Sequence, residues 1–387
     1  MKTIIIETNT FSKDVKKDLI AKISYLGNAD VNFSVLEKSI ELEVKEEDYD
    51  RIKEETDAFL TEICETYKNV KEEILFTWKS QLPPIKEDTF SRLIEEGMVF
   101  EFDKGLVGFG EEFLQIQQLL DKIIVGWGKE YNSKEYSYPD LIGLDTLNQY
   151  NYLEEFPQYL MFSSHLKNDV KLIQHFGKNC NSTNEDCFTD NYIGRPKLAN
   201  KLAVCPHVYK QYEGKTLDIE KPIVISTVGK CKRYEAANMN KCERLLDFTM
   251  REIVILGQSQ DILQIREDFV EKTKKLIQYL QIDADIKSAS DPFFSSKFKP
   301  KILLQRKLKL KYELTIRLPY CDDELAAGSF NYHYDHFAQC FDMKGKNGDL
   351  TTGCMAFGLE RFAYALISQY GVDRIDELIE RLKSYQD

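Results

Sequence analysis

The first 80 residues alternate between apolar patterns typical of strands and patterns typical of helices. The predicted elements, in order, are a strand at 3–8, a helix from the N-cap Ser12 to Gly27, strands at 31–35 and 40–44, a helix with an apolar stripe from Thr56 to Val70, and a strand in EILFTW. This β-α-β-β-α-β order predicts a small ferredoxin-like module of class α+β for residues 1–80. With 12 basic and 18 acidic residues, the module has a net charge of −6, which does not favour an RNA-binding domain.

A polar segment with two adjacent prolines, LPPIKED, follows this module and predicts a linker at 81–89. The remaining residues, 90–387, form a larger predicted domain. Its first helix has an apolar stripe from Phe113 to Trp127. The segment 136–162 is rich in aromatic residues, so it either packs in the core or forms a subunit interface.

The pattern of the second half predicts a sheet with flanking helices. The predicted elements are an irregular stretch at 190–222 with a turn at Pro206, a hairpin at 230–257, a helix from Ile262 to Leu280, a long antiparallel strand at 303–318, a turn around Gly328 in CDDELAAGSFNYHYDHF, and a short strand that leads into a helix at Glu360 and Arg361.

Composition and charge narrow the class of protein. The 387 residues are 43% hydrophobic and 30% charged, with a net charge of −12. This negative charge argues against a protein that binds a long nucleic acid through its phosphates. The start, MKTIIIETN, is not a signal peptide, and no apolar run is long enough to span a bilayer, so we expect a cytoplasmic location. The nine scattered cysteines predict thiols. Cys180 and Cys187 could pair or bind a metal together, but no second closely spaced pair accompanies them, so we expect both thiols to be free.

The predicted hairpin at 230–257 has charged residues where apolar ones are expected. Arg233 and Glu235 would share one face of the first strand, and Phe248 and Glu252 one face of the second. A guanidinium suits a phosphate, an aromatic ring suits a purine, and a carboxylate suits a metal or an amine. The alternative is an exposed hairpin with a salt-bridged outer face. An arginine at the start of a helix, such as Arg361, requires an anion nearby.

Three segments resemble motifs 2 and 3 of the class II aminoacyl-tRNA synthetases. They are RYE (233–235), DFTMREIV (247–254) and GCMAFGLERFAYAL (353–366). Within that class the chain most resembles the zinc-dependent seryl-tRNA synthetases of methanogens and the amino acid:[carrier protein] ligases, the latter also through GSFNYHYDHFAQCF. The resemblance covers roughly residues 90–375. It implies a class II antiparallel sheet flanked by helices, and it makes the segment 139–157 a degenerate motif 1, which in the family belongs to the dimer interface.

The resemblance also implies a zinc site with Cys205, Glu252 and Cys354 as ligands. Two thiolates and one carboxylate leave a fourth tetrahedral position for the α-amine of an amino acid. From the residues alone, a buried Cys205 beside a surface histidine is the commoner arrangement. Glu235 competes with Glu252 as the carboxylate ligand, but its place in RxE suits a contact with ATP.

For ATP as a substrate, the resemblance implies that Arg233 holds the α-phosphate, that Phe248 stacks on adenine and that Arg361 holds the γ-phosphate. Arg233, Glu235 and Arg361 are therefore the predicted catalytic residues. Further candidates for contacts with magnesium or the triphosphate are Arg244, Glu313 and Glu324, and candidates for the pocket of the amino acid side chain are Ser329 and Asn331.

The implied reaction is the ATP-dependent activation of a small amino acid, glycine, alanine or serine, as an aminoacyl adenylate. The acyl group would then pass to the phosphopantetheine thiol of a carrier protein, catalysed by a homodimeric ligase. The alternatives are a seryl-tRNA synthetase and an inactive synthetase paralogue that serves as a binding or regulatory subunit. The small acidic module at 1–80 favours the carrier protein, whereas its likeness to a shortened tRNA-binding domain favours tRNA.

Overall fold

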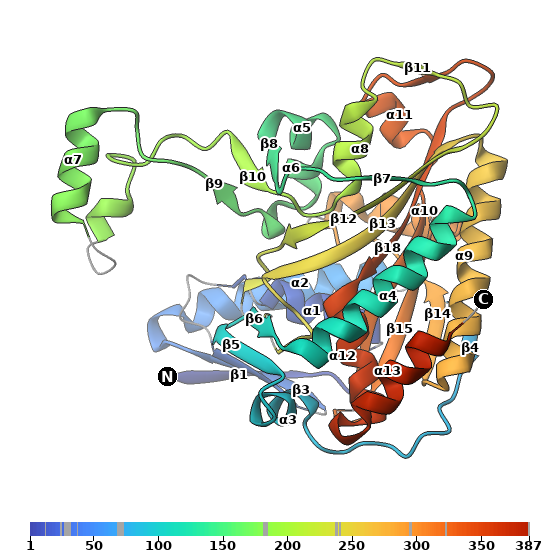
Figure 1. Ribbon diagram of the computed structural model, residues 1–387. Helices are drawn as coiled ribbons and strands as arrows, with labels where there is room; N and C mark the ends of the chain where they lie inside the picture. Colours follow the sequence, from blue (N-terminus) through green and yellow to red (C-terminus); the bar gives the residue numbers. More distant parts are fainter. Residues whose placement is uncertain are drawn as a thin grey trace.

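The computed structural model describes residues 1–385 apart from 12, 24, 27–31, 37, 68–72, 181–184, 237–238, 240, 294–295 and 322. An eight-stranded sheet forms the centre of the larger part (Figure 1). In spatial order its strands are β4 (Ile74–Trp78), β14 (Ala284–Ser288), β15 (Lys311–Leu318), β16 (Asp323–Tyr332), β18 (Thr351–Gly358), β13 (Asp247–Gly257), β12 (Ile223–Lys232) and β7 (Lys134–Tyr136). All neighbours are antiparallel except β12 and β7. The predicted α+β class with an antiparallel sheet is confirmed.

Helices cover one face of the sheet and bury the main hydrophobic core. They are α4 (Glu111–Lys129), α9 (Ser259–Leu280), α12 (Leu359–Tyr370) and α13 (Ile375–Ser384). The stripe predicted from Phe113 to Trp127 lies in α4, where both residues are fully buried. Because apolar residues alternate along β13 and β18, Ile253, Ile255 and Met355 point into this core.

The opposite face of the sheet is covered by short helices and a second, smaller core. Its helices are α5 (Leu144–Gln149), α6 (Tyr152–Glu155), α8 (Cys205–Gln211) and α11 (His336–Cys340). A further helix, α10 (Lys299–Lys307), contacts α6 through the ion pair of Lys301 with Glu155. Val254, Cys354 and Ala356 belong to this second core. The alternation that buries one set of residues under α4 and α9 therefore presents the other set on the face where the candidate site residues lie.

The N-terminal module differs from the predicted ferredoxin-like order in its last strand. Its sheet has three strands, β1 (Lys2–Glu7), β3 (Ser39–Val44) and β2 (Asn32–Val35), with helices α1 (Lys13–Ile23) and α2 (Tyr49–Tyr67). The strand β4 pairs instead with β14 and forms the edge of the large sheet. Strand pairing between distant segments cannot be read from the local pattern. Ser12, Gly27, Val31 and Val70 lie outside the described residues.

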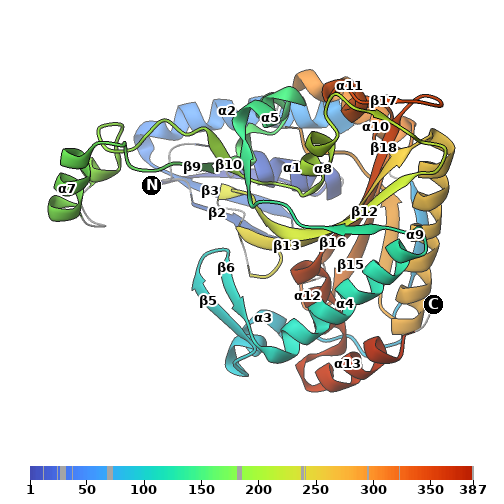
Figure 2. The same ribbon diagram turned by 45° about the horizontal axis from the view of Figure 1, so that its top comes forward.

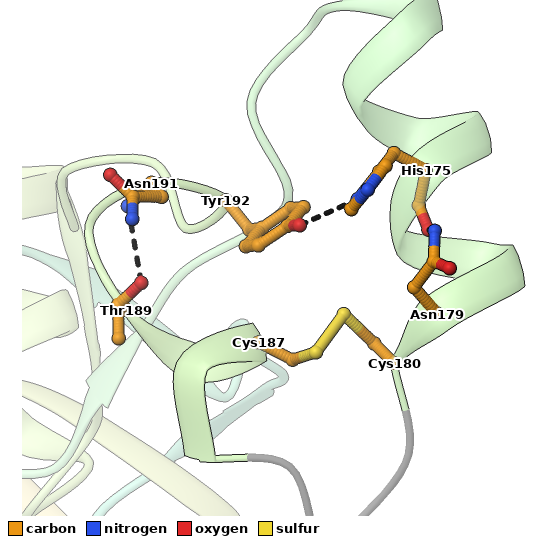
Figure 3. The surroundings of a disulfide bond; sticks show 7 residues. All are labelled: His175, Asn179, Cys180, Cys187, Thr189, Asn191 and Tyr192. Atoms are coloured by element: carbon orange, nitrogen blue, oxygen red, sulfur yellow. Dashed lines mark hydrogen bonds between the residues drawn. A yellow bond between two sulfur atoms is a disulfide. The ribbon is translucent and has the colours of Figure 1, made fainter.

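Residues 164–197 form an arm that extends away from the large sheet, and Figures 1 and 2 show it from two sides. It leaves from a small sheet of β8 (Leu141–Gly143), β10 (Leu198–Asn200) and β9 (Phe162–Ser163), and it carries α7 (Val170–Asn179). The prediction of free thiols here is wrong, because Cys180 and Cys187 form a disulfide (Figure 3). The Cα atoms of these two cysteines lie 5.5 Å apart.

Three predictions in the second half of the chain are corrected. The long strand predicted at 303–318 is a helix, α10, followed by β15; Pro300 stands in the first turn of this helix. The turn predicted around Gly328 is the central strand β16. The stretch predicted as irregular contains α8, where Pro206 again occupies the first turn. Proline is compatible with a first helical turn because the N–H group that it lacks has no partner there.

The remaining short elements connect these parts. They are α3 (Thr89–Glu95), β5 (Val99–Asp103), β6 (Leu106–Phe109), β11 (Thr216–Leu217), β17 (Lys344–Gly345) and the 3-10 turns at Glu46–Asp48, Pro157–Tyr159, Glu185–Phe188, Ser296–Phe298 and Val372–Arg374. None of the helices in the described ranges combines the length and apolar character that a membrane span requires.

Candidate functional site

Strand register places most of the predicted site residues on one face of the large sheet. In one row across the strands, Glu252 on β13 lies opposite Ala356 on β18, which lies opposite Ser329 on β16. In the next row, Cys354 on β18 lies opposite Asn331. Paired residues in antiparallel strands point to the same side. Residues more than 100 positions apart therefore meet on a single surface.

Cys205, Glu252 and Cys354 come together, and one ligand atom from each lies within 4.8 Å of the others. The Cys354 thiol donates to a Glu252 oxygen at 3.2 Å. The two oxygens of Glu252 also accept the backbone N–H groups of Val204 and Cys205, at 2.7 and 2.9 Å. These bonds fix the carboxylate at the start of α8. Cys205 is therefore held at the cluster by the helix that the sequence pattern missed.

The two thiols of the cluster are buried beside the Glu252 carboxylate, and this surrounding shifts their pKa values. Burial, with hydrogen bonds to Cys205 and Glu252, raises the pKa of the Cys354 thiol well above its ordinary value. For Cys205, the hydrogen bond with Cys354 lowers the pKa, but burial and the Glu252 carboxylate raise it to about 11. Without a cation both thiols keep their protons. Two thiols and a carboxylate this close fit a zinc ion, which would displace those protons.

Three arginines converge on Glu235. Arg244 forms an ion pair with it, and the Arg361 guanidinium lies 4.0 Å from its other oxygen. Burial alone would raise the pKa of Glu235, but Arg244, Arg361 and Arg233 outweigh burial and hold the pKa below its ordinary value. The anion expected near Arg361 is thus Glu235. Three guanidinium groups still face the single carboxylate of Glu235, and this surplus of arginines suits a polyanion.

Arg233 and Glu235 lie just beyond the end of β12 at Lys232, not on the strand as predicted. The Arg233 side chain nevertheless turns toward β13. Its Nε donates to the Leu202 carbonyl at 3.0 Å, and its guanidinium lies 5.3 Å from the centre of the Phe248 ring. A cation over one side of an aromatic ring is favourable. This contact places the predicted phosphate ligand beside the predicted adenine ligand.

The candidates for the amino acid side chain lie beside the cysteine–glutamate cluster. The amide of Asn331 donates to the Ser329 hydroxyl at 3.0 Å and to the Cys354 carbonyl at 3.1 Å. Both residues are partly exposed on β16. Because Ser329 lies in the row of Glu252 and Asn331 in the row of Cys354, both are positioned to face a substrate held at the cluster.

The two acidic candidates for magnesium differ in their surroundings. Glu313 lies opposite Ser329 on β15 and pairs with Lys311 at 3.0 Å. Its charge also acts on Arg361, so it belongs to the neighbourhood of the arginine cluster. Glu324 is buried in an ion pair with Lys287. This pairing makes Glu324 the weaker of the two candidates, since binding a cation would compete with Lys287.

Several residues around the site escaped the sequence reasoning. Glu360 accepts hydrogen bonds from the backbone and hydroxyl of Thr249, both at 2.7 Å, and so ties the start of α12 to β13. Tyr159 lies near Glu235 and Arg233. Lys311, held by Asp291 at 2.9 Å, lies opposite Asn331. The alternation along β15, which sets Lys311 and Glu313 on the face opposite Tyr312 and Leu314, is the signal that could have found Lys311.

Comparison with known proteins relates the chain to two kinds of ligase. No protein-family model matches. The type-2 serine–tRNA ligase of Methanococcus aeolicus is 28% identical over 259 residues, which make up 64% of this chain and 49% of that protein. Amino acid–[acyl-carrier-protein] ligase 1 of Bradyrhizobium diazoefficiens is 36% identical over 132 residues, 34% of this chain and 40% of that one. The chain is homologous to both. It spans about half the length, or less, of these relatives.

A solved structure confirms the fold. M. kandleri SerRS, crystallised with A. aeolicus tRNASec, superposes with a TM-score of 0.71 over 98% of this chain and 77% of that chain, at 20% sequence identity. The fold is therefore that of a class II synthetase, as the motifs predicted. At this identity the likeness concerns the fold alone. The roles of individual residues stay predictions that rest on the geometry described above.

Proposed function

We propose that this protein is a ligase that activates a small amino acid with ATP and transfers the aminoacyl group to the thiol of a carrier protein. The observation that carries the proposal is the convergence of Arg233, Arg244 and Arg361 on Glu235, on the same side of the sheet as Cys205, Glu252 and Cys354. An excess of positive charge suits a triphosphate, and the cysteine–glutamate cluster suits a metal that binds an amine.

In the activation step, a carboxylate oxygen of the amino acid attacks the α-phosphorus of ATP. A new P–O bond forms, the bond from the α-phosphorus to the bridging oxygen breaks, and pyrophosphate leaves with the electron pair. Arg233 stabilises the charge on the α-phosphate, while Arg361 holds the γ-phosphate. Phe248, next to Arg233, stacks on the adenine. No protein nucleophile is needed, since positioning and charge stabilisation lower the barrier.

Cys205, Glu252 and Cys354 would hold zinc, which supplies a binding position for the α-amino group of the substrate. Ser329 and Asn331 then face the side chain. Glycine, alanine and serine are the proposed substrates. Glu313, and less favourably Glu324, would contribute to magnesium binding at the triphosphate. Arg244 would contact the triphosphate itself, and Glu235 would contact ATP.

In the transfer step, the sulfur of a phosphopantetheine thiol attacks the acyl carbon of the adenylate. A thioester forms, AMP leaves with the electron pair of the C–O bond, and the thiol proton is released. The sequence identity of 36% over 132 residues with an amino acid–[acyl-carrier-protein] ligase supports this acceptor. The acidic charge of residues 1–80 also disfavours a large contact with tRNA phosphates.

A seryl-tRNA synthetase is the second candidate. The alignment with type-2 serine–tRNA ligases is longer, and the likeness to M. kandleri SerRS extends over 98% of this chain. An inactive paralogue is the third candidate, and the presence of all three arginines and both cysteines argues against it.

Amino-acid-dependent ATP–pyrophosphate exchange tests the first half-reaction. We expect exchange with glycine, alanine or serine, and Arg361→Ala should lower its rate at least about 100-fold, the usual effect of removing a group that stabilises transition-state charge. An exposed arginine of α2 that pairs with Asp48 and Glu55, Arg51, provides the control through Arg51→Ala. Absence of exchange with every standard amino acid would contradict the enzyme proposal.

The acceptor is tested by offering labelled amino acid to a phosphopantetheinylated carrier protein and, separately, to total tRNA. We expect a label that is released by hydroxylamine from the carrier protein and depends on its thiol. An apo carrier protein without phosphopantetheine is the control. Transfer to tRNA alone would establish the second candidate instead.

A further inference from the structure

The segment that bears Arg233 and Glu235 contacts the N-terminal module. Tyr234 lies between these two residues, and its carbonyl oxygen is 2.9 Å from the hydroxyl of Tyr25. The same hydroxyl lies 3.2 Å from the carbonyl of Gln158. Tyr25 therefore bridges two segments that both border the arginine cluster, although it is more than 200 positions away from Tyr234 in the chain.

Tyr25 is held in place by the core of the N-terminal module. Its backbone N–H donates to the Lys22 carbonyl at 3.0 Å, in continuation of α1. Its neighbours Ile23 and Leu26 are buried in the module core, with exposed fractions of 1% and 3%. The ring is therefore carried by a packed helix end. Burial, with smaller contributions from Tyr159 and Glu235, raises the pKa of Tyr25 far above its ordinary value, so the hydroxyl keeps the proton that it donates.

The segment 233–235 needs such support because it lies outside the sheet. The ladder with β13 ends at Lys232, and beyond it the Arg233 N–H donates to the Leu246 carbonyl at 3.1 Å and the Tyr234 N–H donates to the Tyr159 carbonyl at 3.2 Å. The Tyr234 carbonyl is held from the other side by Tyr25. A small shift of this peptide would displace Arg233 and Glu235 together, and catalysis is sensitive to displacements of about 1 Å.

We infer that Tyr25 is a positioning residue for the ATP site, so that the N-terminal module completes the alignment of Arg233 and Glu235. The inference rests on the proposed function for the identity of the ligand. It gives residues 1–80 a role inside the first half-reaction, separate from any contact with the acceptor. A displacement of the module would consequently weaken the binding of ATP.

The test is calorimetric titration of the full-length protein with magnesium–ATP, for wild type and Tyr25→Phe. One neutral hydrogen bond changes an equilibrium constant about fivefold. We therefore expect the Kd for ATP to rise about fivefold, with an unchanged melting temperature and an unchanged metal content. In pyrophosphate exchange, the KM for ATP should rise while the KM for the amino acid stays the same. Tyr49→Phe, in α2 of the same module, is the matched control and should change neither constant.

An unchanged Kd in Tyr25→Phe would overturn the inference, and so would a lowered melting temperature without a change in Kd, which indicates a structural role only. The outcome is separable from that of the proposed function. If the wild type binds ATP but catalyses no exchange, the proposed function fails while the comparison of Kd values still decides the role of Tyr25. If the wild type binds no ATP, both fail.

Discussion

Glu235 shows how a single carboxylate can organise a binding site before the ligand arrives. Three guanidinium groups so close together would repel one another, and Glu235 lowers that repulsion while leaving a net positive charge for a polyanion. Because the carboxylate is only 8% exposed, the ion pair with Arg244 is weakly screened by solvent. The residue thus contributes both to stability and to the shape of the phosphate site.

The first prediction concerns the stability that Glu235 supplies. Removing the buried carboxylate leaves the half-buried charge of Arg244 uncompensated, so Glu235→Gln should lower the free energy of unfolding at pH 7 by about 1–2 kcal/mol. Urea denaturation measures the change. Glu213→Gln removes a carboxylate from the more exposed ion pair with Lys210 and should cost about 0.5 kcal/mol or less. Equal losses in the two variants would contradict the account.

The second prediction concerns how the difference in unfolding free energy between wild type and Glu235→Gln depends on pH. The pKa of Glu235 is lower in the folded protein than the value of about 4.3 for an unfolded glutamate. Its stabilising contribution is therefore fully present above that value and is lost as the pH falls through the folded-state pKa. The gap in unfolding free energy between wild type and Glu235→Gln should stay constant above about pH 5 and shrink below about pH 4. A gap that widens in acid would refute this assignment.

The third prediction concerns the cysteine–glutamate cluster. Cys354→Ala removes a thiol that contacts Glu252 at 3.2 Å, and we expect it to lose about one zinc per chain. Metal analysis of the purified protein measures the content. Cys64→Ala, at an exposed cysteine in α2, should retain the metal. Unchanged zinc in Cys354→Ala would exclude the proposed ligand set.

At the scale of elements, the strand β16 and the helix α8 position residues of the candidate site. The sequence CDDELAAGSFNYHYDHF has the polar density of a loop, yet it forms a central strand whose Phe330 and Tyr332 are buried in the main core. Ser329 and Asn331 alternate with them and face the opposite side. Helix α8 brings Cys205 to Glu252 through two backbone hydrogen bonds. Regular elements therefore hold these residues, which favours a preorganised site.

The fourth prediction concerns the disulfide in the arm. A bridge between Cys180 and Cys187 closes a short loop after α7, and such loops typically contribute about 2–3 kcal/mol. Cys180→Ser should accelerate hydrogen exchange of α7 amides at least about tenfold. The rates in α9 should stay unchanged and provide the internal control. Because the arm extends away from the sheet, pyrophosphate exchange should be unaffected; a loss of exchange activity would contradict this separation.

At the scale of the whole molecule, the small sheet of β8, β10 and β9 exposes two leucines on one face, beside Ser163 and Asn200. Leu141 and Leu198 share this face and are exposed, while Ile142 and Ala199 on the other face are buried in the second core. Homodimer formation, expected from the motif 1 resemblance of 139–157, stays a prediction, and this face is a suitable place for it.

The fifth prediction tests that interface. Sedimentation of the wild type should give twice the chain mass of 45.1 kDa. Leu198→Asp places a charge beside Leu141 on this exposed face. It should shift the monomer–dimer equilibrium toward the monomer by at least about 2 kcal/mol. Leu114→Asp, at an exposed leucine of α4, should leave the dimer intact. A monomeric wild type would exclude the homodimer.

Local pattern predicted the elements whose periodicity is long and regular. The helix α9 follows directly from the spacing of apolar residues, since it buries one face. The predicted hairpin at 230–257 contains β13, but its partner β12 begins at Ile223 and ends at Lys232, before Arg233. Prediction failed where a local pattern fits two structures. Residues 303–307 precede a true strand and continue its apparent alternation, but they form the end of α10, and Lys309 turns the chain with a positive φ of 53° before β15 begins.

The sequence by itself determined the motifs, the residue types of the site and the class II fold that the motifs implied. Only the tertiary structure decided which of these residues meet, because strand register and helix docking depend on contacts between segments far apart in the chain. Register sets Glu252 beside Cys354, α8 adds Cys205, and the arginines surround Glu235. The place of β4 in the large sheet and the contact of Tyr25 with Tyr234 likewise arise from such long-range packing.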